Sequence, residues 1–211
     1  GVGGASGSTT IPDVWISDSS IWLHRLRAAA PGFTPTDGAS IALSPVVLAM
    51  PEPVAKGVGW PAKKVDLPAL LQQILTGSGL RAGLVEPTRD AAGMSGLLAL
   101  GAAAGQAGGG NAKETQTAAL RLLAGGRSAV RDDLTAKFPQ AADQASITTG
   151  LGVAALSEED VIRYNAKRPP VPLAALYLDP APVPLDYPYA VMPGTDPDKT
   201  AAAASLHAAL N

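Results

Sequence analysis

Two segments of this chain place a short apolar run directly before the start of a helix, and a polar cluster lies at each junction. In the first, the mostly apolar residues 11–16 precede SDSS at 17–20 and an amphipathic run at 21–26. In the second, residues 80–85 precede EPTRD at 86–90 and an Ala/Gly/Leu-rich run. Each pattern predicts a strand that leads into a helix. The first N–H groups of each helix have no partner inside it, so they can bind a polar group or an anion.

The rest of the chain alternates between strand and helix patterns. Further strands are predicted over 40–50, 152–156, 173–178 and 187–192, and helices after Asp66 and over 89–104, 114–123, 128–137, 158–164 and 196–210. Asp66 is the expected N-cap of its helix, and Ser157-Glu158-Glu159-Asp160 has the form of a capping box. This alternation predicts an α/β fold with a mostly parallel sheet.

The composition excludes several classes of protein. The 16 basic and 18 acidic residues give a net charge of −2, so the chain has no basic surface suited to nucleic acid or an anionic membrane. Cysteine is absent, which excludes disulfides, thiolate catalysis and cysteine-bound zinc. Neither a nucleophile elbow nor a phosphate-binding loop is present. We therefore predict no catalytic residue, no metal site and no cofactor.

The cluster Ser17, Asp18, Ser19 and Ser20 is the first group of candidate ligand-binding residues. Its hydroxyls and carboxylate can donate and accept hydrogen bonds, but Asp18 would repel an anion. The alternative role is helix capping alone, which Ser and Asp perform in many proteins.

Thr88, Arg89 and Asp90 form the second group and are better placed for an acidic ligand. An arginine binds a carboxylate through two parallel hydrogen bonds. The alternative is a surface ion pair between Arg89 and Asp90, which would leave neither charge for a ligand. Tyr187, at the start of the strand predicted over 187–192, is a further candidate, with packing at the edge of the core as its alternative role.

Several segments, taken in order, resemble the bacterial extracellular solute-binding proteins of the type II periplasmic-binding fold. They are PDVWISDSS at 12–20, SPVVLAMP at 44–51, LVEPTRDAAG at 84–93, SEEDV at 157–161 and DYPYAV at 186–191. The specific resemblance is to a branch found in actinobacteria that is often fused to a von Willebrand factor type A domain. It covers nearly all of residues 11–210.

The resemblance implies a two-lobe α/β fold that closes on a ligand. Residues 1–10 would be a flexible lead-in, residues 11–51 and 171–211 would form lobe 1, and residues 52–170 would form lobe 2. Proteins of this family begin with a strand, a helix and a second strand that have no counterpart here. We therefore expect lobe 1 to be incomplete, the natural chain to be longer at its N-terminus, and the exposed surface to favour self-association.

The implied function is non-catalytic capture of a small polar solute outside the cell or at the cell envelope. The protein would be exported, with an anchor in the preceding segment and a membrane transporter or a von Willebrand type A domain as partner. The implied site comprises Ser17, Asp18, Ser19, Ser20, Ser44, Thr88, Arg89, Asp90 and Tyr187. The alternative is a ligand-free interaction or scaffold domain of a cell-envelope protein, and an uncharacterised hydrolase is a third, weaker hypothesis.

Overall fold

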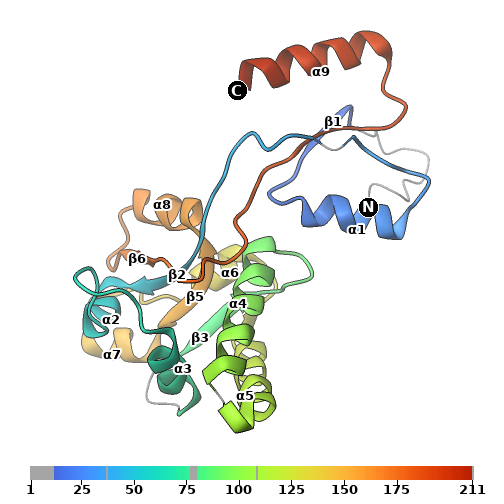
Figure 1. Ribbon diagram of the computed structural model, residues 1–211. Coiled ribbons are helices and arrows are strands. Elements are labelled where there is room, and N and C mark those ends of the chain that lie inside the picture. Colours follow the sequence, from blue (N-terminus) through green and yellow to red (C-terminus); the bar gives the residue numbers. More distant parts are fainter. Residues whose placement is uncertain (1–11, 37, 77–79, 108, 211) are drawn as a thin grey trace. The chain divides into compact units, whose positions relative to one another are not determined.

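The computed structural model describes residues 12–36, 38–76, 80–107 and 109–210, and these divide into two compact units (Figure 1). Unit 1 combines the described residues up to Leu43 with those from Leu185 onward, and unit 2 is the continuous stretch Ser44–Pro184. The lead-in predicted over residues 1–10 lies outside the described residues. None of the described helices is long and apolar enough to cross a membrane.

Unit 1 is built on a two-stranded antiparallel sheet. Strand β1 (Val14–Ile16) pairs with β7 (Tyr189–Val191), and helices α1 (Ile21–Ala29) and α9 (Pro197–Leu210) flank them in the sequence. The buried hydroxyl of Tyr189 donates a hydrogen bond to the carbonyl of Ala203 at 2.8 Å. This bond joins α9 to β7, so the C-terminal helix is part of unit 1.

Unit 2 contains a mixed five-stranded sheet in the order β4-β3-β5-β2-β6. Its strands are β2 (Val46–Pro51), β3 (Ala82–Val85), β4 (Arg127–Ser128), β5 (Val153–Ser157) and β6 (Leu173–Leu176). Strand β3 is parallel to β4 and β5, as predicted, whereas β2 is antiparallel to both of its neighbours. The prediction of a mostly parallel sheet was wrong for β2, because the long connection after it can return the chain to either end of the sheet.

Helices cover both faces of this sheet. They are α2 (Glu52–Gly57), α3 (Leu67–Leu75), α4 (Ala91–Ala107), the 3-10 helix η1 (Gly109–Asn111), α5 (Ala112–Gly125), α6 (Arg131–Thr135), α7 (Gln144–Thr149) and α8 (Glu158–Ala166). Successive residues of β2 alternate between two hydrophobic clusters, because side chains of a strand point to opposite faces. Leu48 and Met50 pack with residues of α2 to α5, whereas Val47 and Ala49 pack with residues of α6 and α8.

The two units divide between Leu43 and Ser44 and between Pro184 and Leu185, and the lobe boundaries expected after residues 51 and 170 stay a prediction. Strand β2 pairs with β5 on one side and with β6 on the other, so both β2 and β6 belong to the sheet of unit 2. The apolar run predicted as one strand over 40–50 is a strand only from Val46, and Ser40 instead forms an isolated bridge with Pro188 in unit 1. All six residues of β2 are buried, which requires a strand on each side and a helix layer on each face.

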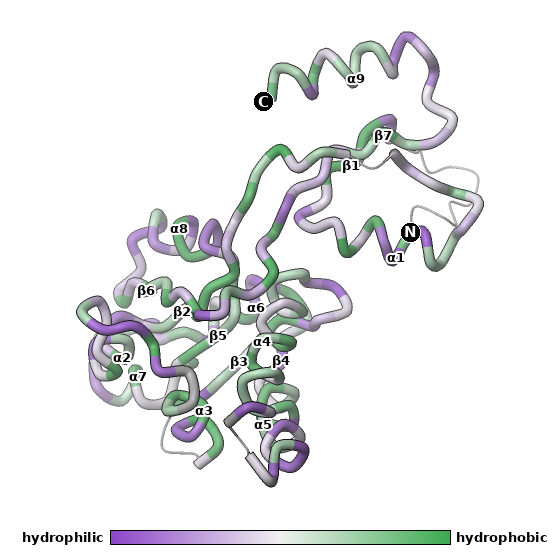
Figure 2. The backbone as a smooth tube through the Cα atoms, in the orientation of Figure 1, coloured by the Kyte–Doolittle hydropathy of each residue, from purple (hydrophilic) through white to green (hydrophobic). Residues whose placement is uncertain are grey.

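Helix α4 is hydrophobic along most of its length and packs closely on the sheet (Figure 2). A Cβ atom added at Gly93 would lie 2.5 Å from the carbonyl oxygen of Val85, and one added at Gly96 would overlap the side chain of Ala155. These two glycines therefore allow the first turns of α4 to lie directly against β3 and β5. At Gly105, near the other end of the helix, an added Cβ would meet nothing within 4 Å.

We predict that Gly96→Ala lowers the free energy of unfolding by about 1–3 kcal/mol, because the new methyl group overpacks the contact with Ala155. The matched substitution Gly105→Ala should raise it by up to about 1 kcal/mol, because alanine favours the helix and meets no neighbour there. Urea denaturation of both variants measures the difference. An unchanged stability for Gly96→Ala would show that α4 does not pack closely on β5.

Candidate functional site

The candidate site in unit 2 lies at the edge of the sheet where the parallel strands end. Val85 pairs with Ser128, and Ser157 pairs with Val46, so β3, β4 and β5 end at the edge where β2 begins. Helices α4, α6 and α8 begin at or shortly after this edge. Ligands of open α/β sheets bind at the carboxyl ends of the strands. We call this region the carboxyl edge.

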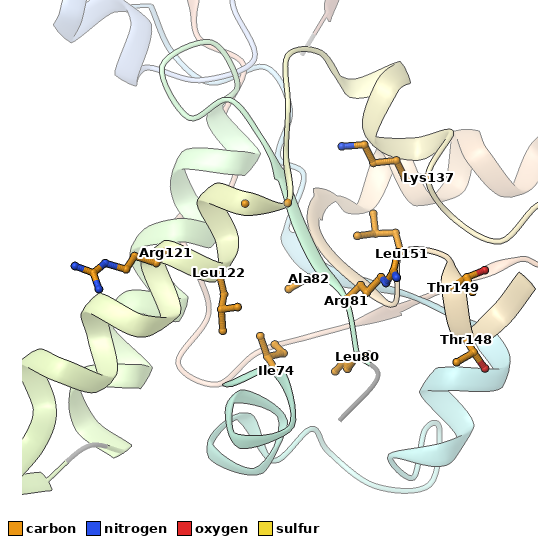
Figure 3. A pocket seen from close by; sticks show the side chains of 12 residues that line it. Ile74, Leu80, Arg81, Ala82, Arg121, Leu122, Lys137, Thr148, Thr149 and Leu151 are labelled. Atoms are coloured by element: carbon orange, nitrogen blue, oxygen red, sulfur yellow. The ribbon is translucent and has the colours of Figure 1, made fainter. Parts of the chain in front are cut away.

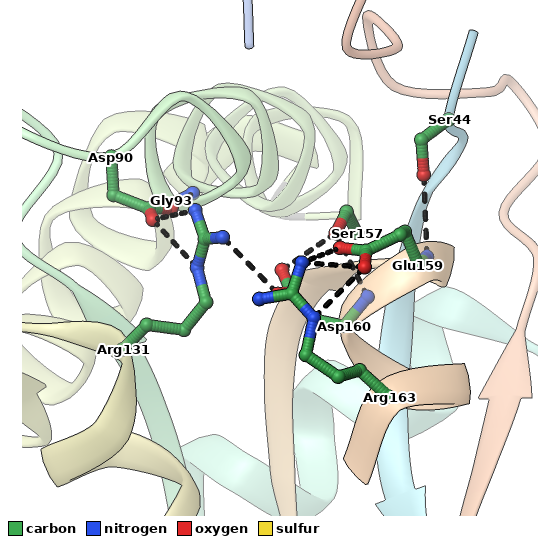
Figure 4. Close-up of polar contacts among 8 residues, drawn as sticks. All are labelled: Ser44, Asp90, Gly93, Arg131, Ser157, Glu159, Asp160 and Arg163. Atoms are coloured by element: carbon green, nitrogen blue, oxygen red, sulfur yellow. Dashed lines mark hydrogen bonds and ion pairs between the residues drawn. The ribbon is translucent and has the colours of Figure 1, made fainter. Parts of the chain in front are cut away.

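Arg131 joins the starts of three helices at the carboxyl edge (Figure 4). Its guanidinium contacts Asp90 through Nη2 at 2.6 Å and Nε at 3.2 Å, and Asp160 through Nη1 at 3.1 Å. The side chains of Asp90 and Asp160 are 5% and 4% exposed, and that of Arg131 is 30% exposed. Asp90 also caps α4 by accepting a hydrogen bond from the N–H of Gly93 at 2.7 Å. Asp90 is therefore a structural residue whose charge is opposed by Arg131.

The start of α8 is capped by hydrogen bonds within unit 2. The hydroxyl of Ser157 accepts a hydrogen bond from the N–H of Asp160 at 3.1 Å and donates one to the carboxylate of Asp160 at 2.6 Å. The predicted capping residue Ser157 is thus confirmed. The hydroxyl of Ser44 accepts a hydrogen bond from the N–H of Glu159 at 3.3 Å. Ser44, a predicted ligand contact, is buried and serves to cap α8.

Arg89 is the candidate residue with the least engaged side chain. It is exposed, and its guanidinium makes no hydrogen bond or ion pair with another residue in the described part of the chain. Its predicted partner Asp90 is bound instead by Arg131, so the alternative of a surface pair between Arg89 and Asp90 was wrong. Asp90 pairs with Arg131 and accepts the capping hydrogen bond from Gly93 at the start of α4. The charge of Arg89 is therefore available to another group.

Thr88 and Glu86 order the turn that carries Arg89. The backbone N–H and the hydroxyl of Thr88 donate to Glu86 Oε1 at 3.3 and 3.0 Å, and Glu86 pairs with Arg127 at 2.9 Å. The hydrogen bonds from Thr88 lower the pKa of Glu86 below its usual value, and the charges of Arg127 and Arg89 add to this effect. Thr88 is exposed, and its hydroxyl is directed to Glu86 within its own turn.

An exposed tyrosine lies at the same edge, directly after β6. The hydroxyl of Tyr177 donates a hydrogen bond to the carboxylate of Glu158, the first residue of α8, and this bond raises the pKa of Tyr177. The sequence analysis did not identify Tyr177, because it lies 19 positions after Glu158 and no local pattern places the two together.

In unit 1, Ser17 and Ser19 make local hydrogen bonds at the start of α1. The buried Ser17 donates its hydroxyl hydrogen to the carbonyl of Ser19 at 2.9 Å, and the hydroxyl of Ser19 accepts from the N–H of Ile21 at 3.3 Å. The N–H of Ser20 donates to Asp186 Oδ1 at 2.7 Å. Asp186 therefore acts as a cap from 166 residues away, a role that the sequence analysis missed. These contacts match the alternative role of the cluster, which is helix capping.

Asp18 and Tyr187 lie together in unit 1. The indole N–H of Trp22 donates to Asp18 Oδ1 at 2.5 Å, and the backbone N–H of Tyr187 contacts the carbonyl of Asp18 at 3.4 Å. Tyr187 has a φ of 39°, in the left-handed region that favours glycine. Backbone strain of this kind is often found at functional sites. The candidate residues thus form two groups, one in each unit: residues 17–20 with Tyr187, and Ser44 with residues 88–90.

We predict that Arg131→Met lowers the free energy of unfolding by about 2–4 kcal/mol, because it leaves two buried carboxylates without their cation. The expected loss of stability is slightly smaller than for a fully buried ion pair, because Arg131 is partly exposed. The matched control is Arg163→Met, which removes an exposed pair with Glu159 on α8 and should cost less than about 1 kcal/mol. Equal losses in the two variants, measured by urea denaturation, would contradict the bridging role of Arg131.

Comparison with known proteins identifies the family. The sequence model of the bacterial extracellular solute-binding protein family matches residues 5–210. A crystal structure of a protein from Bordetella parapertussis, proposed to be an extracellular solute-binding protein, has a similar fold, with a TM-score of 0.56 and 12% sequence identity. The similarity covers 95% of this chain and 65% of that one, and no curated protein sequence matches significantly. Because the family model spans nearly the whole sequence, this chain belongs to the bacterial extracellular solute-binding protein family.

Proposed function

We propose that this protein captures a small anionic solute outside the cell, with Arg89 at the carboxyl edge of unit 2 as the main contact. The observation that carries the proposal is the state of Arg89. It is exposed, it lies two residues before a 17-residue helix, and its guanidinium has no hydrogen-bond or ion-pair partner among the described residues. A guanidinium in this state can form two parallel hydrogen bonds with a carboxylate, phosphate or sulfate group.

The charges around Arg89 support an anionic ligand. The nearest carboxylates each have another cation, since Arg127 pairs with Glu86 and Arg131 pairs with Asp90. The helix dipole of α4 adds partial positive charge at the same place. The charge of Arg89 is therefore only partly offset within the turn, and an anion gains from both contributions.

In unit 1, Ser20, Asp18 and Tyr187 are half-buried and are proposed as further ligand contacts. Ser17, Ser19, Ser44 and Asp90 support the site through the capping bonds described above. Thr88 orients the turn of Arg89 and contributes to ligand binding less than the arginine does.

We further propose that capture is not coupled to catalysis and that the bound solute passes to a membrane transporter. The protein would be exported, as the extracellular assignment of its family implies. Four further features stay predictions: a membrane anchor, fusion to a von Willebrand type A domain, an incomplete lobe 1, and self-association.

The test is calorimetry against a panel of amino acids, dicarboxylates, inorganic oxyanions and sugar acids. Arg89→Ala should weaken binding of the best anionic solute by about tenfold to a hundredfold, the loss expected when a charge-assisted hydrogen bond is removed. The melting temperature without solute should not change, because Arg89 is exposed. The matched control is Arg121→Ala, which removes an exposed arginine of α5 and should leave affinity unchanged.

Two results would contradict the proposal. Equal affinity in wild type and Arg89→Ala would remove Arg89 from the site. Absence of binding and of thermal stabilisation across the whole panel would favour the ligand-free scaffold function instead.

A further inference from the structure

A cavity lies at the end of the unit 2 sheet opposite the carboxyl edge, where β3 and β5 begin (Figure 3). It measures about 860 Å³ and is lined by the segments just before β3, β4 and β5 and by residues of α3, α5 and α7. Leu122 on α5 and Ile74 on α3 lie on one side of the cavity, and Leu151 lies on the side away from α5. The cavity shares no lining residue with the carboxyl edge.

Three basic side chains and no acidic one line this cavity. The basic residues are Arg81, Arg121 and Lys137, and all three are exposed. None of them forms an ion pair with a carboxylate in the described part of the chain, and the ammonium of Lys137 donates to the backbone carbonyl of Arg127 at 3.3 Å. This local excess of three positive charges occurs in a chain whose net charge is −2.

The three basic side chains are oriented differently relative to the cavity. Figure 3 shows Arg121 extending outward from α5, away from the space between Leu122 and Ile74. Arg81 and Lys137 lie with Leu151 on the other side of the cavity, opposite Leu122. The cavity therefore combines an apolar wall on α3 and α5 with a cationic side near the start of β3.

We propose that this cavity binds a small amphipathic anion, with its apolar body against Leu122 and Ile74 and its charged head at Arg81 and Lys137. The volume lies in the range of sites that enclose a small organic ligand, and such sites are mostly apolar with few polar groups. The proposed occupant is a free molecule and not a lipid of a bilayer, because a chain with a net charge of −2 offers no extended basic surface to an anionic membrane. This site is independent of the proposed solute site at Arg89.

The test uses decanoate below its micelle concentration, with decyltrimethylammonium as the cation of matched chain length. Decanoate should bind saturably with one molecule per chain, and the cation should bind at least tenfold more weakly. Leu122→Glu places a carboxylate at an exposed position of the cavity wall and should weaken decanoate binding at least tenfold. The double variant Arg81→Gln/Lys137→Gln should weaken it three- to tenfold and abolish the preference for the anion.

A control variant locates the site. Leu98→Glu, at a 61% exposed position of α4 outside the cavity, should leave decanoate binding unchanged. Absence of saturable binding, equal affinity for the two amphiphiles, or wild-type affinity in Leu122→Glu would overturn the proposal. The proposal would also be overturned if the protein sedimented with anionic phospholipid vesicles and Leu122→Glu abolished this sedimentation. The ligand would then be a lipid surface.

Discussion

The contact of Arg131 with Asp90 and Asp160 is the interaction on which the carboxyl edge of unit 2 depends. Asp90 belongs to the start of α4 and Asp160 to the start of α8, and these helices pack on opposite faces of the sheet. One guanidinium therefore fixes the two helix starts relative to each other and to α6. Because both carboxylates are buried, the arrangement is stable only while the cation is present.

This arrangement has a direct consequence for ligand binding. An aspartate at a helix start would normally repel an anion, but the charge of Asp90 is opposed by Arg131 and its oxygens are occupied by Arg131 and the N–H of Gly93. Glu86 is likewise paired with Arg127. In the proposed function, Arg89 binds the anion because the neighbouring carboxylates of Asp90 and Glu86 are already paired with other arginines.

Local patterns in the sequence predicted many of the elements, but not α2, β4 or α7. The helix predicted over 128–137 is a helix only over Arg131–Thr135. Long-range contacts could not be predicted. Asp66 and Ser157 cap their helices as expected, because a cap depends on residues within three positions. No local pattern specifies strand direction, so the antiparallel pairing of β2 with β5 and β6 was not predicted. The partners of Arg131 lie 41 and 29 residues away in the sequence, so the true partner of Asp90 was missed.

We propose that Arg89 binds the solute while Arg131 remains engaged with Asp90 and Asp160. NMR of the arginine side-chain Nε–Hε groups, assigned with Arg89→Lys and Arg131→Lys, tests this during titration with a panel of dicarboxylates, amino acids and inorganic oxyanions. We predict that a bound anion shifts the Arg89 signal in a saturable manner and leaves the Arg131 signal in place. A saturable shift of Arg131 with no change at Arg89 would contradict this account.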